Sequence, residues 1–108
     1  MSDKAITIDR MEGAMEFLAE SDESFAILKT DLLRAELLAK RVRARVFVTG
    51  EGSVEMRKAH AEGHGDVIEA DDTLIEATLN FERLKAQRSR AELVIDVWRT
   101  CEASRRKS

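Results

Sequence analysis

The chain has 108 residues, of which 44% are hydrophobic and 36% are charged, and it contains no proline. This length leaves room for one domain, and so many charges need a large solvated surface, which long thin helices provide better than a compact globule. The formal net charge of −3 argues against tight nucleic-acid binding by a lone monomer.

Two features of the sequence set the expected location. The single cysteine, Cys101, excludes an internal disulfide and gives no support for a stapled secreted scaffold. Residues 1–10 lack the pattern of a signal peptide, and no apolar run reaches the roughly 18 residues that a membrane span requires. We therefore expect a soluble cytoplasmic protein without a membrane partner.

Charge alternates in blocks along the chain. Residues 1–24 carry a net charge of −5, residues 25–61 carry +4, residues 62–82 carry −7 and residues 83–108 carry +5. Each acidic block can neutralise a basic one, either within a helical bundle or between subunits.

The first expected elements are a frayed segment over residues 1–7 and an amphipathic helix over about residues 8–20. Apolar residues of this helix recur at intervals of three and four, which is typical of a helix with one buried side. The sequence Ser-Asp-Glu-Ser at 21–24 is expected to end this helix and begin another, because Ser and Asp accept hydrogen bonds from the free amides of a helix start.

A second helix is predicted over residues 22–48, where apolar residues alternate by three and four for three heptads. A further apolar line, Leu33, Leu37 and Ala44, is expected to lie beside this seam and to widen the buried face. The seam itself contains Phe25, Leu28, Leu32, Ala35, Ala39, Val42 and Val46.

Glycines mark the remaining breaks. Gly50 and Gly52 indicate a turn, Ser53 can cap a short helix over residues 54–62, and the sequence Gly-His-Gly at 63–65 ends it. The last helix is predicted over residues 66–103, with residues 104–108 disordered. Its seam is Val67, Ala70, Leu74, Ala77, Phe81, Leu84, Arg88, Ala91, Ile95 and Trp98.

These elements predict an all-α fold in which long helices form a hairpin or bundle within one domain, residues 1–108. Because the long helices carry more apolar surface than one pair can bury, we expect oligomerisation to complete the fold; a monomeric three- or four-helix bundle is the alternative. Arg88 in the seam can set register or oligomer state, or its stem can extend to solvent. The residues predicted for the oligomer seam are Leu32, Val42, Val46, Phe81, Arg88, Ile95 and Trp98.

The sequence contains no recognisable catalytic or metal-binding arrangement. His60 and His64 are four residues apart, but glycines follow and no third ligand is close in sequence, so a solvated histidine pair is expected. Carboxylates over residues 69–76 are explained by the favourable field at the start of a helix. We therefore expect a protein that is not an enzyme and that uses no cofactor and no metal.

The most prominent local feature is the basic run at residues 40–45, Lys-Arg-Val-Arg-Ala-Arg. Lys40, Arg41, Arg43 and Arg45 bracket an apolar line, and such clusters bind nucleic-acid phosphates without reading the base sequence. The competing interpretation is a solvated helix end that forms ion pairs with the acidic blocks.

Several short motifs follow one another over roughly residues 30–103. They are Arg43-Ala44-Arg45, Gly50-Glu51-Gly52, Glu55-Met56-Arg57 and Asp66-Val67, followed by the long last helix. This order resembles the UvsY family, the recombination mediators of T-even phages. The resemblance implies a mostly helical protein that assembles into a ring, binds single-stranded DNA, and helps a recombinase displace a single-strand-binding protein, with Arg43 and Arg45 at the positions used for DNA.

Two functions are therefore expected. The first is a phage or prophage recombination accessory protein, a homo-oligomer whose repeated basic patches bind single-stranded DNA with avidity. The second is a non-enzymatic protein interaction module without DNA binding, such as a virion-assembly protein, chaperone or regulatory adaptor. In the second case the basic run pairs with acidic residues of its own subunits.

Overall fold

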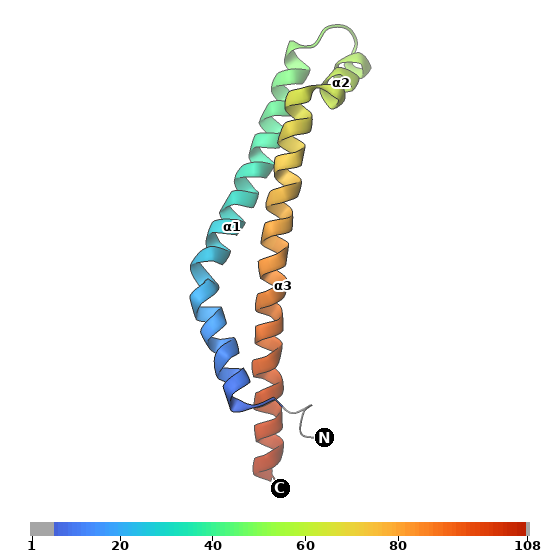
Figure 1. Ribbon diagram of the computed structural model, residues 1–108. Helices are drawn as coiled ribbons and strands as arrows, with labels where there is room; N and C mark the ends of the chain where they lie inside the picture. Colours follow the sequence, from blue (N-terminus) through green and yellow to red (C-terminus); the bar gives the residue numbers. More distant parts are fainter. Residues whose placement is uncertain (1–5, 108) are drawn as a thin grey trace. The chain divides into compact units, whose positions relative to one another are not determined.

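The computed structural model describes residues 6–107, which form three helices and no strand (Figure 1). Helix α1 spans Ile8–Thr49, α2 spans Val54–Gly63 and α3 spans Gly65–Lys107. The all-α hairpin predicted from the sequence is confirmed, since α1 packs against α3. No helix within residues 6–107 has an apolar stretch long enough to cross a membrane.

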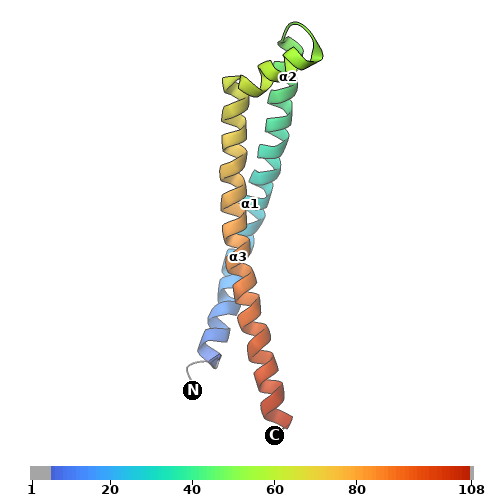
Figure 2. The ribbon, with the colours of Figure 1, turned by 90° about the vertical axis from the view of Figure 1, so that its right-hand side faces the viewer.

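The hairpin is divided into two compact units. Unit 1 consists of Met1–Ala26 and Glu82–Ser108, and unit 2 consists of Ile27–Phe81. Each unit contains a segment of α1 packed on a segment of α3, and in unit 2 the short α2 connects the end of α1 to the start of α3 (Figures 1 and 2).

Helix α1 is continuous through residues 21–24, so the predicted break at that point is wrong. The hydroxyl of Ser21 donates a 2.7 Å hydrogen bond to the backbone carbonyl of Phe17. A serine inside a helix can bond in this way to the preceding turn and does not then act as a cap. Ser21 is also only 7% exposed, because it occupies a seam position that would otherwise hold an apolar side chain.

The sequence predicted the start of α1 better than the end of α3. The hydroxyl oxygen of Thr7 accepts a 3.1 Å hydrogen bond from the amide of Arg10 and so caps the start of α1. Helix α3 continues to Lys107, so residues 104–107 are helical rather than disordered. Residues 1–5 and 108, for which disorder was also expected, lie outside the described residues.

The turn between α1 and α2 forms where the glycines indicated it. Gly52 has a φ angle of 94°, in the left-handed region that a side chain disfavours. The hydroxyl oxygen of Ser53 then accepts a 3.2 Å hydrogen bond from the amide of Met56, so Ser53 is the cap of α2.

Each unit has its own small core. In unit 1, Met11 and Ala14 of α1 pack with Ala91 and Ile95 of α3. In unit 2, Val46, Ala61 and Val67 come from α1, α2 and α3 respectively, so this cluster holds the short helix against both long ones. Val46 and Val67 are each 1% exposed, and full burial of such a side chain stabilises a fold by about 1.5–3 kcal/mol.

Candidate interaction surface

The residues predicted for an oligomer seam lie between α1 and α3 of a single chain. Val46 belongs to the core of unit 2, while Ile95 and Trp98 pack in the core of unit 1. Leu32, Val42 and Phe81 are half-buried. Val42, Val46, Ile95 and Trp98 therefore help to hold the hairpin together, whereas Leu32 and Phe81 also line an open groove of about 370 Å³ on unit 2.

Arg88, the charged member of the α3 seam, is held inside unit 1 and does not extend to solvent. Its guanidinium donates hydrogen bonds to the carbonyl of Leu18 at 2.9 Å, to the hydroxyl of Ser21 at 2.7 Å and to the carboxylate of Asp22 at 2.8 Å. The same group lies 4.9 Å from the ring centre of Phe25, a favourable cation–π distance. The side chain is 17% exposed, so Arg88 makes a polar layer within the apolar seam.

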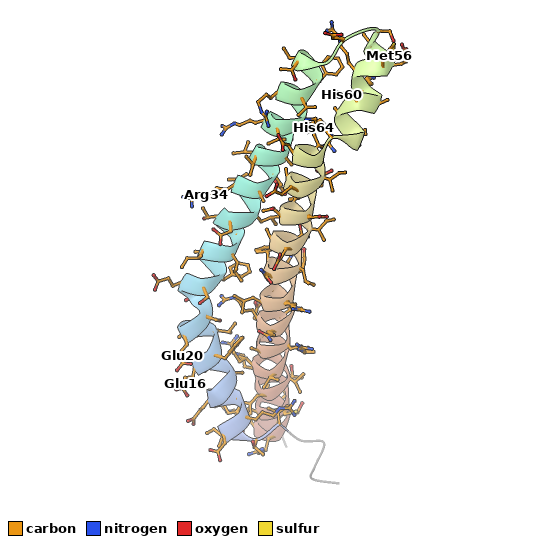
Figure 3. The ribbon with its side chains drawn as sticks, turned by 45° about the horizontal axis from the view of Figure 1, so that its top comes forward. Glu16, Glu20, Arg34, Met56, His60 and His64 are labelled. Atoms are coloured by element: carbon orange, nitrogen blue, oxygen red, sulfur yellow. The ribbon has the colours of Figure 1, made fainter. Side chains whose placement is uncertain are left out.

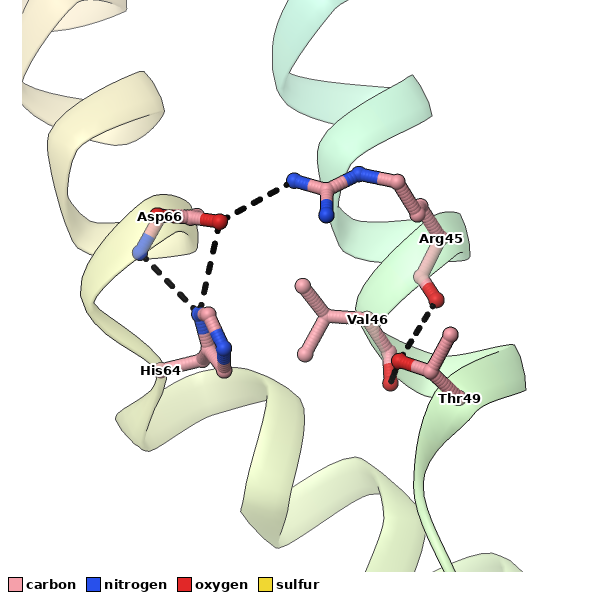
Figure 4. Close-up of polar contacts among 5 residues, drawn as sticks. All are labelled: Arg45, Val46, Thr49, His64 and Asp66. Carbon is pink, nitrogen blue, oxygen red and sulfur yellow. Dashed lines mark hydrogen bonds and ion pairs between the residues drawn. The ribbon is translucent and has the colours of Figure 1, made fainter.

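The basic run divides into two pairs. Arg43 and Arg45 form the pair that is bound to acidic residues of the same chain. Arg43 forms 2.9 Å ion pairs with Glu62 of α2 and Asp71 of α3. Arg45 forms a 3.1 Å ion pair with Asp66, at the start of α3 (Figure 4). The hydrogen bonds that Arg43 donates to Glu62 and to Asp71 raise the pKa of Arg43 above its ordinary value, so its side chain is charged at any pH near neutrality.

His60 and His64 lie beside the ion pairs of Arg43 and Arg45. Their rings are in edge contact, with centres 5.6 Å apart (Figure 3). Nδ1 of His64 accepts a 3.1 Å hydrogen bond from the amide of Asp66, an arrangement that helps to begin α3 (Figure 4). Within residues 6–107, no group of three or more His, Cys, Asp or Glu side chains is arranged to hold a metal ion.

The second pair of the basic run, Lys40 and Arg41, is exposed, and neither side chain forms an ion pair within residues 6–107. Lys40 also borders a groove of about 420 Å³ between α1 and α2. Apolar atoms dominate its lining, which is formed by Lys40, Arg43, Ala44, Phe47, Val48, Lys58, Ala61 and Glu62. Of the four residues predicted to contact phosphate, Arg43 and Arg45 are thus neutralised by ion pairs, whereas Lys40 and Arg41 form none in the described part of the chain.

In unit 2, each long helix carries a second apolar row on its outward side, which is the side that faces away from the other long helix. At about 100° per residue, Leu33, Leu37 and Ala44 lie about 130–170° around α1 from the centre of its seam. They are exposed and lie opposite the seam, so the predicted position beside the seam is wrong. Figure 3 shows the neighbouring Arg34 on the side of α1 that faces away from α3.

The outward side of α3 in unit 2 carries a similar row. Ile68, Ile75 and Leu79 are 49%, 66% and 46% exposed, although side chains of this kind are usually buried. Asp72 continues the row, and Glu69 and Glu76 flank it. The outward side of α3 is thus apolar and acidic, whereas that of α1 is apolar and basic.

Comparison with protein-family models, with curated proteins and with solved structures finds no match. We therefore infer function from the surfaces of the two units.

One part of this surface agrees with the alternative interpretation of the basic run, and another was missed in the sequence. Ion pairs of the basic run with the acidic block at residues 62–82 were expected in that alternative, and Arg43 and Arg45 form them with Glu62, Asp66 and Asp71. The outward row of α3 was overlooked because the stronger seam at Val67, Ala70 and Leu74 interleaves with it. Its signal was a second three-and-four spacing that begins at Ile68.

Proposed function

We propose that the protein is a non-enzymatic helical interaction module that associates with copies of itself. The observation that supports this most directly is the set of large apolar side chains that unit 2 leaves exposed on its two long helices. On α1 and α3 these are Ile27, Leu33, Leu37, Leu38, Val48, Ile68, Ile75 and Leu79.

The arrangement of these side chains matters more than their number. Single exposed apolar residues are ordinary, but contiguous apolar rows on a soluble surface are characteristic of protein interaction sites. A helix with apolar rows on two opposite sides is suited to lie between two neighbours. One neighbour is the other helix of the hairpin, and the second has to come from another chain.

Self-association is tested by light scattering on purified protein over a concentration series. The expected result is a mass of several chains that falls toward one chain on dilution. A matched pair of variants, Leu37→Gln/Ile75→Gln on the outward rows and Glu16→Gln/Glu20→Gln on exposed positions of unit 1, separates the rows from general surface changes. A mass of one chain for the native protein at every concentration would contradict the proposal.

Binding of single-stranded DNA, as part of a phage recombination mediator that loads a recombinase, is the second candidate. The observation in its favour is the free charge of Lys40 and Arg41, with Lys58 on the border of the same groove as Lys40. In this candidate Arg43 and Arg45 contribute less than the sequence implied, because their ion pairs with acidic side chains would have to be exchanged for phosphates.

A labelled oligonucleotide titrated at low and moderate salt decides between the candidates. DNA binding by this surface predicts saturable binding that weakens with salt and is lost in Lys40→Ala/Arg41→Ala. The control Arg99→Ala/Arg106→Ala removes the same number of charges from unit 1. Absence of binding by the native protein at low salt rejects the second candidate and leaves the first in place.

A further inference from the structure

The outward rows of α1 and α3 in unit 2 have the same spacing. Counted from Leu33, the α1 row has members after four, seven and eleven residues, namely Leu37, Lys40 and Ala44. Counted from Ile68, the α3 row has members at the same intervals, namely Asp72, Ile75 and Leu79. Each row is therefore about 17 Å long, and both carry one charged member among apolar ones.

We propose that the α1 row of one copy packs antiparallel on the α3 row of a second copy, an inference that rests on the self-association proposed above. In this antiparallel alignment, each residue of the α1 row lies opposite a residue of the α3 row that suits it. Leu33 lies opposite Leu79, Leu37 opposite Ile75, Lys40 opposite Asp72 and Ala44 opposite Ile68. Apolar side chains meet apolar ones, and the single cation of one row meets the single anion of the other.

Parallel alignment does not give this match. It places Leu37 opposite Asp72 and Lys40 opposite Ile75, so that both charged groups would lose water against an apolar side chain without gaining a partner. Spacing and charge together therefore fix the direction of the helices.

The positions that flank the two rows are also complementary. Arg34 and Arg41 lie along one border of the α1 row, and Glu76 and Glu69 lie along the corresponding border of the α3 row. The antiparallel alignment brings Arg34 near Glu76 and Arg41 near Glu69, as flanking charges do in paired helices. All four side chains are exposed, and none forms an ion pair within residues 6–107.

The two rows cannot meet within one chain. Each lies about 130–170° from the seam through which α1 and α3 of that chain pack on each other, so the rows point in opposite directions. Because the contact joins two different surfaces, each added copy leaves one α1 row and one α3 row open. Such head-to-tail contacts continue until they close in a ring or extend as a filament.

The contact is short, so association should respond to concentration and to salt. Three helical turns bury less area than the roughly 800 Å² per partner of a standard interface, and six charged groups at the contact are partly screened by salt. Closure of a ring would add avidity, since each copy would then be held by two contacts.

Charge reversal tests the pairing. Lys40→Glu/Arg41→Glu makes both rows acidic, and Glu69→Lys/Asp72→Lys makes both basic, so we expect each variant alone to give the mass of one chain. An equimolar mixture should recover the mass of an assembly, because each variant then offers the row that the other needs. Arg99→Glu/Arg106→Glu carries the same change of net charge as the first variant and should assemble like the native protein. Circular dichroism establishes that each variant is folded.

A disulfide experiment measures the same contact without altering charge. In a Cys101→Ser background, Leu37→Cys on one copy and Ile75→Cys on another should link rapidly on oxidation, whereas either variant alone should link slowly. Equal linking of Leu37→Cys with itself would overturn the pairing in favour of a contact between like rows.

Failure of the mixed charge variants to assemble would also overturn the pairing, although the native assembly would still support self-association. A native protein of one-chain mass would remove both proposals together.

Discussion

Arg88 of α3 donates a 2.7 Å hydrogen bond to the hydroxyl of Ser21 of α1 in the interior of unit 1. Ser21 in turn donates to the carbonyl of Phe17 at 2.7 Å, so the arginine and the α1 backbone are joined through one hydroxyl. Asp22 binds the outer side of the guanidinium and balances its charge. The two seams thus contain one polar layer whose members bind each other, and we expect this layer to favour the observed register of α1 on α3 in this unit.

Replacement of this arginine is expected to destabilise the hairpin. Arg88→Ala removes the hydrogen bonds to Leu18, Ser21 and Asp22 and leaves a gap in the seam, and we expect a loss of about 2 kcal/mol in the free energy of unfolding. The measurement is urea unfolding followed by helical circular dichroism. Arg90→Ala, at an exposed position of the same helix, is the control and should change stability by less than about 0.5 kcal/mol. Equal losses for the two variants would contradict the role given to Arg88.

The sequence predicted the helices well because their apolar seams repeat regularly. It failed at Ser21, where the same residue type that caps helices can also sit inside one. The three-and-four spacing of Met11, Ala14, Leu18, Phe25 and Leu28 does continue through position 21, so the seam itself was a sign of one continuous helix. The second partner of the hydroxyl, Arg88, lies 67 residues away in the chain and became apparent only once α3 lay beside α1.

The candidate site was predicted only in part for a similar reason. Lys40 and Arg41 are exposed as expected, but the partners of Arg43 come from α2 and α3. A run of basic residues shows that charge is present and does not show which of those charges the fold itself neutralises. The outward row opposite the seam was visible in the spacing, but its exposure followed only from the packing of α1 on α3.

Two valines near the end of α1 should respond very differently to truncation. Val46 is 1% exposed in the core that joins the three helices, whereas Val48 is 72% exposed. Val46→Ala removes two buried methyl groups and leaves a cavity, with an expected loss of about 1–3 kcal/mol. Val48→Ala should change the stability of the single chain by less than about 0.5 kcal/mol. Thermal unfolding of both variants at low protein concentration makes the comparison, and a larger effect at Val48 would contradict the placement of the core.

Two glycines should respond to alanine in opposite directions. Gly52 has a φ angle of 94°, and a Cβ atom there would lie 2.9 Å from the sulfur of Met56. Gly52→Ala should therefore cost about 1–2 kcal/mol in stability. Gly13 lies inside α1 and a Cβ atom would meet nothing within 4 Å, so Gly13→Ala should stabilise by about 0.5–1 kcal/mol. Unfolding midpoints of the two variants in urea test the pair, and stabilisation by Gly52→Ala would show that this turn is not left-handed.

The ion pair between Arg43 and Asp71 is expected to contribute little to stability, although its geometry is good. Both side chains are 38% exposed, and double-mutant cycles of such pairs usually give about 0.2–1 kcal/mol. We expect a cycle of Arg43→Ala and Asp71→Ala to give a coupling in this range that declines as salt is added. Because the pKa of Arg43 is raised in the folded state, its contribution is complete below the ordinary pKa of arginine and is lost only in strongly alkaline solution. The coupling should therefore be the same at neutral and mildly alkaline pH, and a decline over that interval would show that another group controls it.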